Sequence, residues 1–263
     1  MRPGNCRLIS QIMKYPASFS QLDWPKVLDD PVALVERALQ VKAFQKASRV
    51  VLPVQDEPFQ RALGVHLVYD WRLGIKVDTE YWQEDQAIEY LQTIYLTKDK
   101  LAVFFEVIKQ LKDQGEEVLV EVSGVFTLMN AFLPYEKMIL MTRKNRPLFD
   151  KITQKIVPII IQYMTWLDEL GVDYIYFADA VSGVDIVGPR FFKEYLGPLL
   201  LQMMDSAQSF KTSELLLCPR SFLSLELMGV LEKDRQGIFH STACSALIGD
   251  VPIGEAYSLK GIT

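Results

Sequence analysis

The stretch that decides the fold is Leu170-Gly-Val-Asp-Tyr-Ile-Tyr-Phe-Ala-Asp179. Its apolar run, Tyr174–Ala178, is short and rich in aromatic and branched side chains, which is typical of a strand buried on both faces. Pro147–Gly171, just before it, has apolar residues at helical spacing, and Gly171 stands where a glycine commonly ends a helix. The stretch therefore predicts a helix that leads into a parallel strand, with Asp179 at the carboxyl end of that strand.

The same alternation of helix and strand extends along the chain from about residue 29. The predicted helices are Pro31–Ala47, Glu84–Tyr95, Lys98–Gly115, Pro147–Gly171, Arg190–Ser209 and Ser221–Glu232. The predicted strands are Arg49–Val54, Glu117–Val122, Asp173–Ala178, Glu214–Leu217, Gly237–His240 and Ala246–Ile248. The segment Leu67–Trp82 fits a hairpin, an extended excursion or a further strand. This pattern predicts an α/β fold with a parallel sheet, of the (β/α)8 TIM-barrel type.

The length and composition suit one barrel domain. The chain has 263 residues, of which 49% are hydrophobic, and it contains neither a repeat nor a linker. Residues 1–28 hold scattered aromatic residues and prolines without a clear period, so we expect an N-terminal extension that wraps the outside. We expect residues 29–263 to form the single domain.

Charge and cysteine content narrow the classes of partner. The formal net charge of -5 argues against nucleic acid or an anionic membrane as a partner, which leaves a small molecule. The most apolar helical segment, Ile156–Leu167, is too short and too interrupted to span a bilayer, and the N-terminal segment lacks the apolar run of a signal peptide. Cys6, Cys218 and Cys244 are far apart and suggest no disulfide framework, so we expect a cytoplasmic protein.

Polar residues follow the predicted strands, where the reacting groups of a barrel lie. The residues in these positions are Gln55, Asp56, Glu57, Ser123, Gly124, Asp179, Ser182, Cys218, Arg220, His240, Ser241, Gly249 and Asp250. Strand ends are also polar simply because they reach solvent, so each residue has a structural alternative. Asp179 is the leading candidate, because a carboxylate at the mouth of an apolar barrel gains a raised pKa or binds a cation. Its alternative role is that of a helix cap or a turn residue.

A zinc site is the second hypothesis. Cys218, His240 and Cys244 would supply three ligands of a tetrahedral site and leave the fourth position open. The alternatives are a buried Cys218 thiol and a histidine satisfied within the core, and the spacing alone does not decide between them.

Three segments together resemble the uroporphyrinogen decarboxylase superfamily. They are Val122-Ser-Gly-Val-Phe-Thr-Leu-Met129, the stretch 170–179, and Val187-Gly-Pro-Arg-Phe-Phe-Lys-Glu-Tyr-Leu-Gly-Pro198. The superfamily is a (β/α)8 barrel that includes decarboxylases and zinc-dependent methyltransferases, which move methyl groups between corrinoid proteins and thiols. The resemblance implies catalytic roles for Asp56 and Asp179. It implies substrate-binding roles for Gln55, Ser123, Gly124, Phe126, Ser182 and Arg220.

The departures from the decarboxylase pattern favour the methyltransferase branch. The arginine-rich amino-terminal motif is missing, Ala131 stands where decarboxylases have a tyrosine, and Gln55 replaces their substrate-binding aspartate. A polycarboxylate substrate needs such partners. The methyltransferases carry a His-x-Cys pair, of which Cys218 matches the cysteine while Leu216 replaces the histidine.

The resemblance thus leaves three functions open. The leading one is a corrinoid-linked methyltransferase that acts on a methylcobamide or a small thiol, with zinc or with no bound cofactor. The alternatives are a uroporphyrinogen decarboxylase and a catalytically silent barrel that serves as a binding or regulatory partner. The expected partners are a small molecule or a methyl-corrinoid protein. The chain ends before the family's last strand would appear, so we expect a seam in the barrel that residues 1–28 or a homodimer would close.

Overall fold

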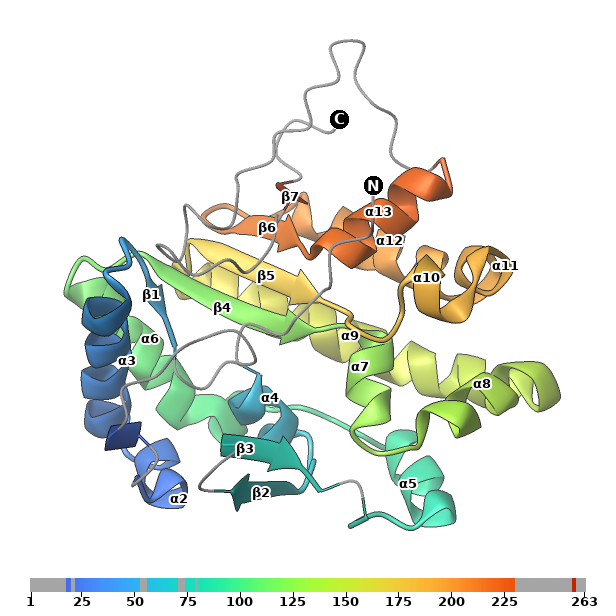
Figure 1. Ribbon diagram of the computed structural model, residues 1–263, viewed down its shortest axis with the longest axis horizontal. Helices are drawn as coiled ribbons and strands as arrows, with labels where there is room; N and C mark the ends of the chain where they lie inside the picture. Colours follow the sequence, from blue (N-terminus) through green and yellow to red (C-terminus); the bar gives the residue numbers. More distant parts are fainter. Residues whose placement is uncertain are drawn as a thin grey trace.

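The fold is built on a largely parallel sheet. The structure, a computed structural model, describes residues 18–19, 22–52, 56–70, 74–78, 80–229 and 257–258. Within these ranges the sheet has the order β1-β4-β5-β6-β7 (Figure 1). The strands are β1 (Val50–Val51), β4 (Val118–Ser123), β5 (Tyr174–Ala178), β6 (Glu214–Leu217) and β7 (Tyr257–Ser258). The neighbours from β1 to β6 run parallel, whereas β7 runs antiparallel to β6.

The four parallel strands confirm the predicted ones to within a few residues at each end. Their side chains are buried on both faces, and every residue of β4 is buried, which explains why these segments are continuous apolar runs rather than alternating ones. The short β7 was not predicted. The predicted strands Gly237–His240 and Ala246–Ile248 lie outside the described residues.

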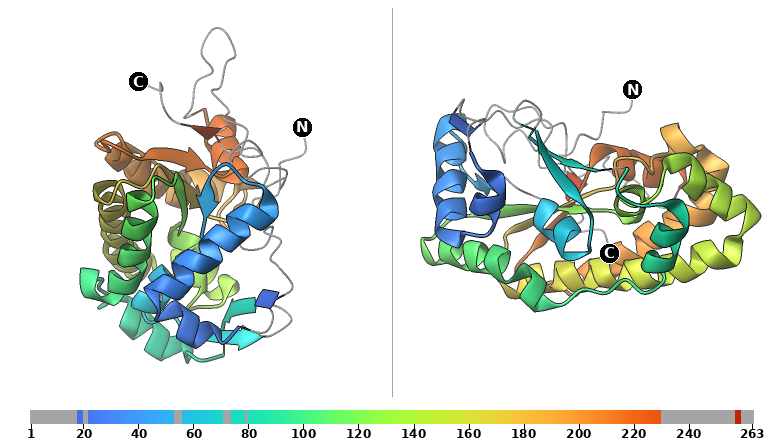
Figure 2. Two further views of the ribbon diagram at one scale, coloured as in Figure 1. Left: turned by 90° about the vertical axis from the view of Figure 1, so that its left-hand side faces the viewer. Right: turned by 90° about the horizontal axis from the view of Figure 1, so that it is seen from below.

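Long helices cover the sheet (Figures 1 and 2). They are α3 (Pro31–Gln45), α6 (Ala102–Asp113), α9 (Arg146–Glu169) and α12 (Gly197–Ala207). Local sequence explains their limits: the Asp30 carboxylate accepts hydrogen bonds from Val32 N at 3.0 Å and Ala33 N at 3.2 Å, and so caps α3. Gly171 has a φ of +78° just after α9, which confirms it as the residue that ends this helix. None of the helices in the described ranges is both long and apolar enough to cross a membrane.

The shorter elements complete the described chain. They are α2 (Trp24–Leu28), α4 (Glu57–Ala62), β2 (Leu67–Asp70), β3 (Gly74–Val77), α5 (Glu84–Leu91), η2 (Lys98–Leu101), α7 (Val125–Asn130), α8 (Tyr135–Lys144), α10 (Val184–Val187), α11 (Pro189–Phe191), η3 (Phe192–Leu196) and α13 (Pro219–Leu227). The segment Leu67–Trp82, which fitted three different structures from its sequence, contains an antiparallel hairpin, β2–β3. Helix α2 lies inside the predicted N-terminal extension, and its Val27 and Leu28 are buried in the core.

One buried carboxylate joins two elements near the amino ends of the strands. Asp168, in the last turn of α9, accepts hydrogen bonds from the backbone N–H groups of Lys211, Thr212 and Ser213 at 2.7–3.0 Å. These residues directly precede β6, so Asp168 fixes where that strand begins. Burial disfavours its charged form, but the backbone donors outweigh burial and lower the pKa of Asp168.

Candidate functional site

The candidate site lies where β4 and β5 end side by side. Ser123 and Ala178 are paired in the parallel register, so the residues that follow them, Gly124 and Asp179, are brought into direct contact. The Gly124 N–H donates to the Ala178 carbonyl oxygen at 3.0 Å. The carboxyl ends of these two strands therefore place a carboxylate against the start of α7.

Asp179 is almost fully buried, with 7% of its surface exposed. Its Oδ1 accepts hydrogen bonds from Thr127 N and Thr127 Oγ1, both at 2.8 Å, and its Oδ2 accepts one from Phe126 N at 3.2 Å. Burial raises the pKa of Asp179, although the hydrogen bonds from Thr127, Phe126 and Ser182 oppose the rise. The sequence left a helix cap as the alternative role of Asp179. The structure shows this role, because Asp179 caps α7 from the neighbouring strand.

This contact requires a glycine at position 124. A Cβ atom built on Gly124 would lie 2.4 Å from the Asp179 Cβ and 2.6 Å from its Oδ2. Any side chain here would displace the carboxylate from the first turn of α7. Gly124 was predicted to bind substrate, and that role stays a prediction; what the structure shows is its close approach to Asp179.

Asp56 forms a second buried carboxylate centre, between the start of α4 and the end of β4. It accepts hydrogen bonds from Ser123 N at 3.1 Å, from the Ser123 hydroxyl at 2.5 Å and from Gln60 Nε2 at 2.5 Å. Burial raises the pKa of Asp56, and these hydrogen bonds act in the opposite direction. Two predicted residues, Asp56 and Ser123, are therefore direct partners. Gln55, predicted beside them, lies outside the described residues.

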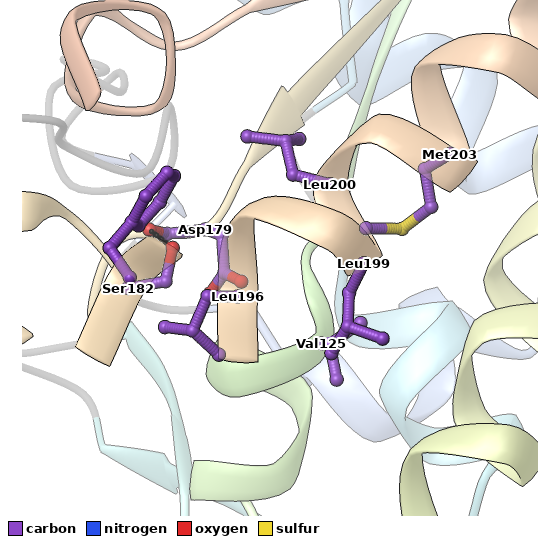
Figure 3. A pocket seen from close by; sticks show the side chains of 8 residues that line it. Val125, Asp179, Ser182, Leu196, Leu199, Leu200 and Met203 are labelled. Atoms are coloured by element: carbon purple, nitrogen blue, oxygen red, sulfur yellow. Dashed lines mark hydrogen bonds between the residues drawn. The ribbon is translucent and has the colours of Figure 1, made fainter. Parts of the chain in front are cut away.

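The loop after β5 carries two further predicted residues. Ser182 donates from its hydroxyl to the backbone carbonyl of Asp179 at 3.0 Å, which closes a tight turn (Figure 3). Arg220, at the start of α13, donates from Nη1 to the Ala180 carbonyl oxygen at 2.7 Å, and its Nε lies 3.2 Å from Asp185 Oδ1. Its guanidinium group is thus already bound to protein atoms of this loop.

A narrow pocket opens beside Asp179 (Figure 3). Asp179 and Ser182 supply its polar atoms, and the rest of the lining is apolar. The apolar residues are Val125, Phe192, Leu196, Leu199, Leu200 and Met203. Most of them come from η3 and α12, so this helical segment forms one wall of the pocket.

The structure separates some residues that the sequence grouped. Asp56 and Arg220 do not line this pocket, and the Phe126 ring is buried among Phe149 and Phe191, so Phe126 contributes its backbone N–H rather than its side chain. Sequence reasoning missed Thr127 and the wall from η3 and α12. Thr127 stands at the first turn of a six-residue helix, α7, which was too short to predict.

The described residues do not assemble a zinc site. They contain no group of three or more histidine, cysteine, aspartate or glutamate residues that could hold a metal. Cys218 is buried, with its sulfur 3.3 Å from the Ser221 hydroxyl oxygen. The other two predicted ligands, His240 and Cys244, lie outside the described residues.

The arrangement defines a class of protein. Helices alternate with parallel strands, and the buried polar groups gather at the carboxyl ends of the strands, as in α/β proteins of the TIM-barrel type. Residues 8–223 match the uroporphyrinogen decarboxylase (URO-D) family. The chain belongs to this family.

A solved structure is similar in fold. A methyltransferase from Methanosarcina mazei superimposes with a TM-score of 0.60 at 19% sequence identity, and the match covers 80% of this chain. The match spans 61% of the length of that methyltransferase chain. A comparison with curated proteins finds no match. At this identity the likeness supports the barrel-type fold, which confirms the fold predicted from the sequence.

Proposed function

We propose that this protein is a corrinoid-linked methyltransferase that holds a small substrate in the pocket beside Asp179. The observation that carries the proposal is a buried carboxyl group at the end of a narrow and otherwise mostly apolar pocket. In this structure the pocket admits about one water molecule, so the proposal requires it to widen when a small substrate with one polar group binds. The fold shared with a methyltransferase supports the same branch of the family.

The charges at this edge of the sheet argue against a polycarboxylate substrate. Several carboxylates of one ligand need arginine or lysine partners, which bind them through strong charge-assisted hydrogen bonds. Arg220, the cation predicted for this site, is already bound to Ala180 and Asp185, and the described lining of the pocket includes no lysine or arginine. Methyl transfer on a small molecule therefore fits this edge better than decarboxylation of uroporphyrinogen.

In the proposed reaction the protein mainly positions and shields the substrate. Asp179 anchors its polar group, while the wall from η3 and α12 excludes water and limits how the substrate can turn. A corrinoid, which we expect to arrive on a partner protein, supplies the methyl-carrying cobalt when bound.

The test supplies methylcobalamin and a small thiol or amine to the purified protein and follows the transfer of the methyl group by mass spectrometry. We expect Asp179→Asn to lower the rate by about 10- to 100-fold, the usual size of one lost charged hydrogen bond. Asp168→Asn is the matched control, because it alters another buried aspartate that accepts backbone N–H groups, outside the pocket lining.

The two alternative functions have their own readouts. Formation of coproporphyrinogen from uroporphyrinogen, without methyl transfer, would contradict the proposal and identify a decarboxylase. Neither reaction, together with tight binding of a methylated corrinoid protein, would identify a binding or regulatory partner.

A further inference from the structure

We infer that the pocket beside Asp179 opens by movement of one of its walls, residues 189–196, about a hinge at Gly197 and Pro198. This segment consists of α11 and η3, and we call it the gate. The inference rests on the proposed function only for the identity of the ligand that enters, because the movement belongs to the free protein.

The closed pocket calls for a moving wall. It has room for about one water molecule, and Asp179 is 7% exposed. Phe192 and Leu196, from the gate, belong to the lining together with residues of α7 and α12 (Figure 3). Any group larger than water therefore reaches the Asp179 carboxyl group only when part of this lining moves.

The helix is interrupted where the gate meets α12. The Gly197 N–H donates to the Phe192 carbonyl oxygen, five residues back, whereas an α-helix would bond four residues back. The next residue, Pro198, has no N–H, so this position donates to no carbonyl of the preceding turn. A change of the π turn to α-helical bonding would shift the gate by about one residue, roughly 1.5 Å along the helix axis. The gate is thus joined to α12 by a weakened and adjustable turn.

The other end of the gate is also free to move. Gly188, just before it, has a φ of +82°, and a Cβ atom built on Gly188 would meet no atom within 4 Å. Helix α10 has no buried residue and lies with α11 at the edge of the molecule (Figure 1). In contrast, α12 packs against α9 and buries Leu200 and Met203. We therefore expect the gate to move while α12 stays in place.

Side-chain contacts hold the gate closed. Apart from its continuation into α12, its backbone makes no hydrogen bond to another helix or strand in the part of the chain that the structure describes. Phe191 packs edge-to-face on Phe126 with ring centroids 5.9 Å apart, and the Arg146 guanidinium group lies 4.4 Å from the centre of the Tyr195 ring. An exposed cation–π contact shifts an equilibrium by only about two- to fivefold. The open form is therefore accessible without unfolding of the rest of the protein.

Thiol labelling of the full chain tests the movement. Val125, on α7, lines the pocket and is 1% exposed, so the thiol of Val125→Cys meets iodoacetamide only when the gate opens. Val122→Cys is the matched control, because Val122 is fully buried at the end of β4 and does not line the pocket. Peptide mass spectrometry separates these sites from the native cysteines. We expect position 125 to react at least about tenfold faster than position 122, since local opening costs less than global unfolding. Equal rates would overturn the inference.

Variants of the hinge and of the closing contact, made together with Val125→Cys, assign the movement to the gate. Pro198→Ala adds an N–H that bonds across the hinge and should slow labelling by about fivefold, whereas Pro147→Ala, in the first turn of α9, should not change it. Arg146→Gln removes the cation–π contact and should speed labelling by about two- to fivefold. Arg143→Gln, which alters an exposed arginine in the last turn of α8, is its control. Labelling rates that neither variant changes would refute the gate.

Hydrogen exchange on the unmodified chain gives a second readout that needs no folded variant. The backbone amides of residues 190–196 should exchange at least about tenfold faster than those of residues 199–207, because the gate opens while α12 remains packed. Equal protection of the two halves of this helix would contradict the inference.

The outcomes separate this inference from the proposed function. Gate opening without methyl transfer from methylcobalamin would retain the inference and reject the methyltransferase proposal. Methyl transfer by a protein whose position 125 is as protected as position 122 would retain the proposal and reject the gate.

Discussion

At the scale of single residues, the tightest constraint is the approach of Gly124 to Asp179. Gly124→Ala places a Cβ atom 2.4 Å from the Asp179 Cβ, so we expect a loss of about 1–3 kcal/mol in the free energy of unfolding. Urea unfolding of the variant measures this loss. The loss should shrink when Asp179 is also changed to glycine, because the clash then has no partner. An equal loss in both backgrounds would mean that Gly124 is needed for another reason.

Asp168 should make stability depend on pH in the acid range. Its pKa is lowered in the folded protein, so its contribution is fully present above the unfolded pKa of about 3.9 and is lost as pH falls through the folded pKa. Asp168→Asn should flatten the fall in the free energy of unfolding below about pH 4. Denaturant unfolding between about pH 2 and 6 measures both slopes, and identical slopes would contradict the assignment.

At the scale of elements, α9 contains a residue that weakens it. Pro158 lies within this 24-residue helix and is exposed, so the Gln154 carbonyl has no N–H to accept from at position 158. Pro158→Ala should raise the free energy of unfolding by about 1–3 kcal/mol, because alanine restores the missing N–H group. Proline also restricts the unfolded chain, and the loss of that effect reduces the gain. Pro147→Ala, in the first turn where no N–H partner is needed, is the control and should bring no gain. No gain from Pro158→Ala would indicate that the helix has adapted around the proline.

The helices and strands also differ in how well the sequence predicts them. Segments with strong periodicity, such as α3, α9 and β5, were predicted close to their observed limits because each carries its own apolar pattern and end signals. The short helices α7 and α8 were missed. Their six and ten residues hold too little pattern to stand out, and they are stabilised by contacts with the rest of the fold.

At the scale of the whole molecule, one core connects distant parts of the chain. The largest buried apolar cluster includes residues from α2 to α13, and Trp24, Trp82 and Trp166 pack against it. We therefore expect unfolding followed by tryptophan fluorescence and by far-ultraviolet circular dichroism to give coincident transitions. Two separated transitions would show that part of the described chain unfolds on its own. The homodimer stays a prediction, and light scattering tests it.

The sequence by itself determined the barrel-type fold, the family, and the presence of polar residues at the strand ends. Each of these depends on local apolar runs and short motifs, which can be recognised along the chain. Only the tertiary structure decided what those residues do. Asp179 caps α7 and lines a pocket whose wall is α12, while Asp56 pairs with Ser123 instead. Those partners are set by strand register and helix packing, which join residues far apart in the chain. Spacing along the sequence does not contain that information.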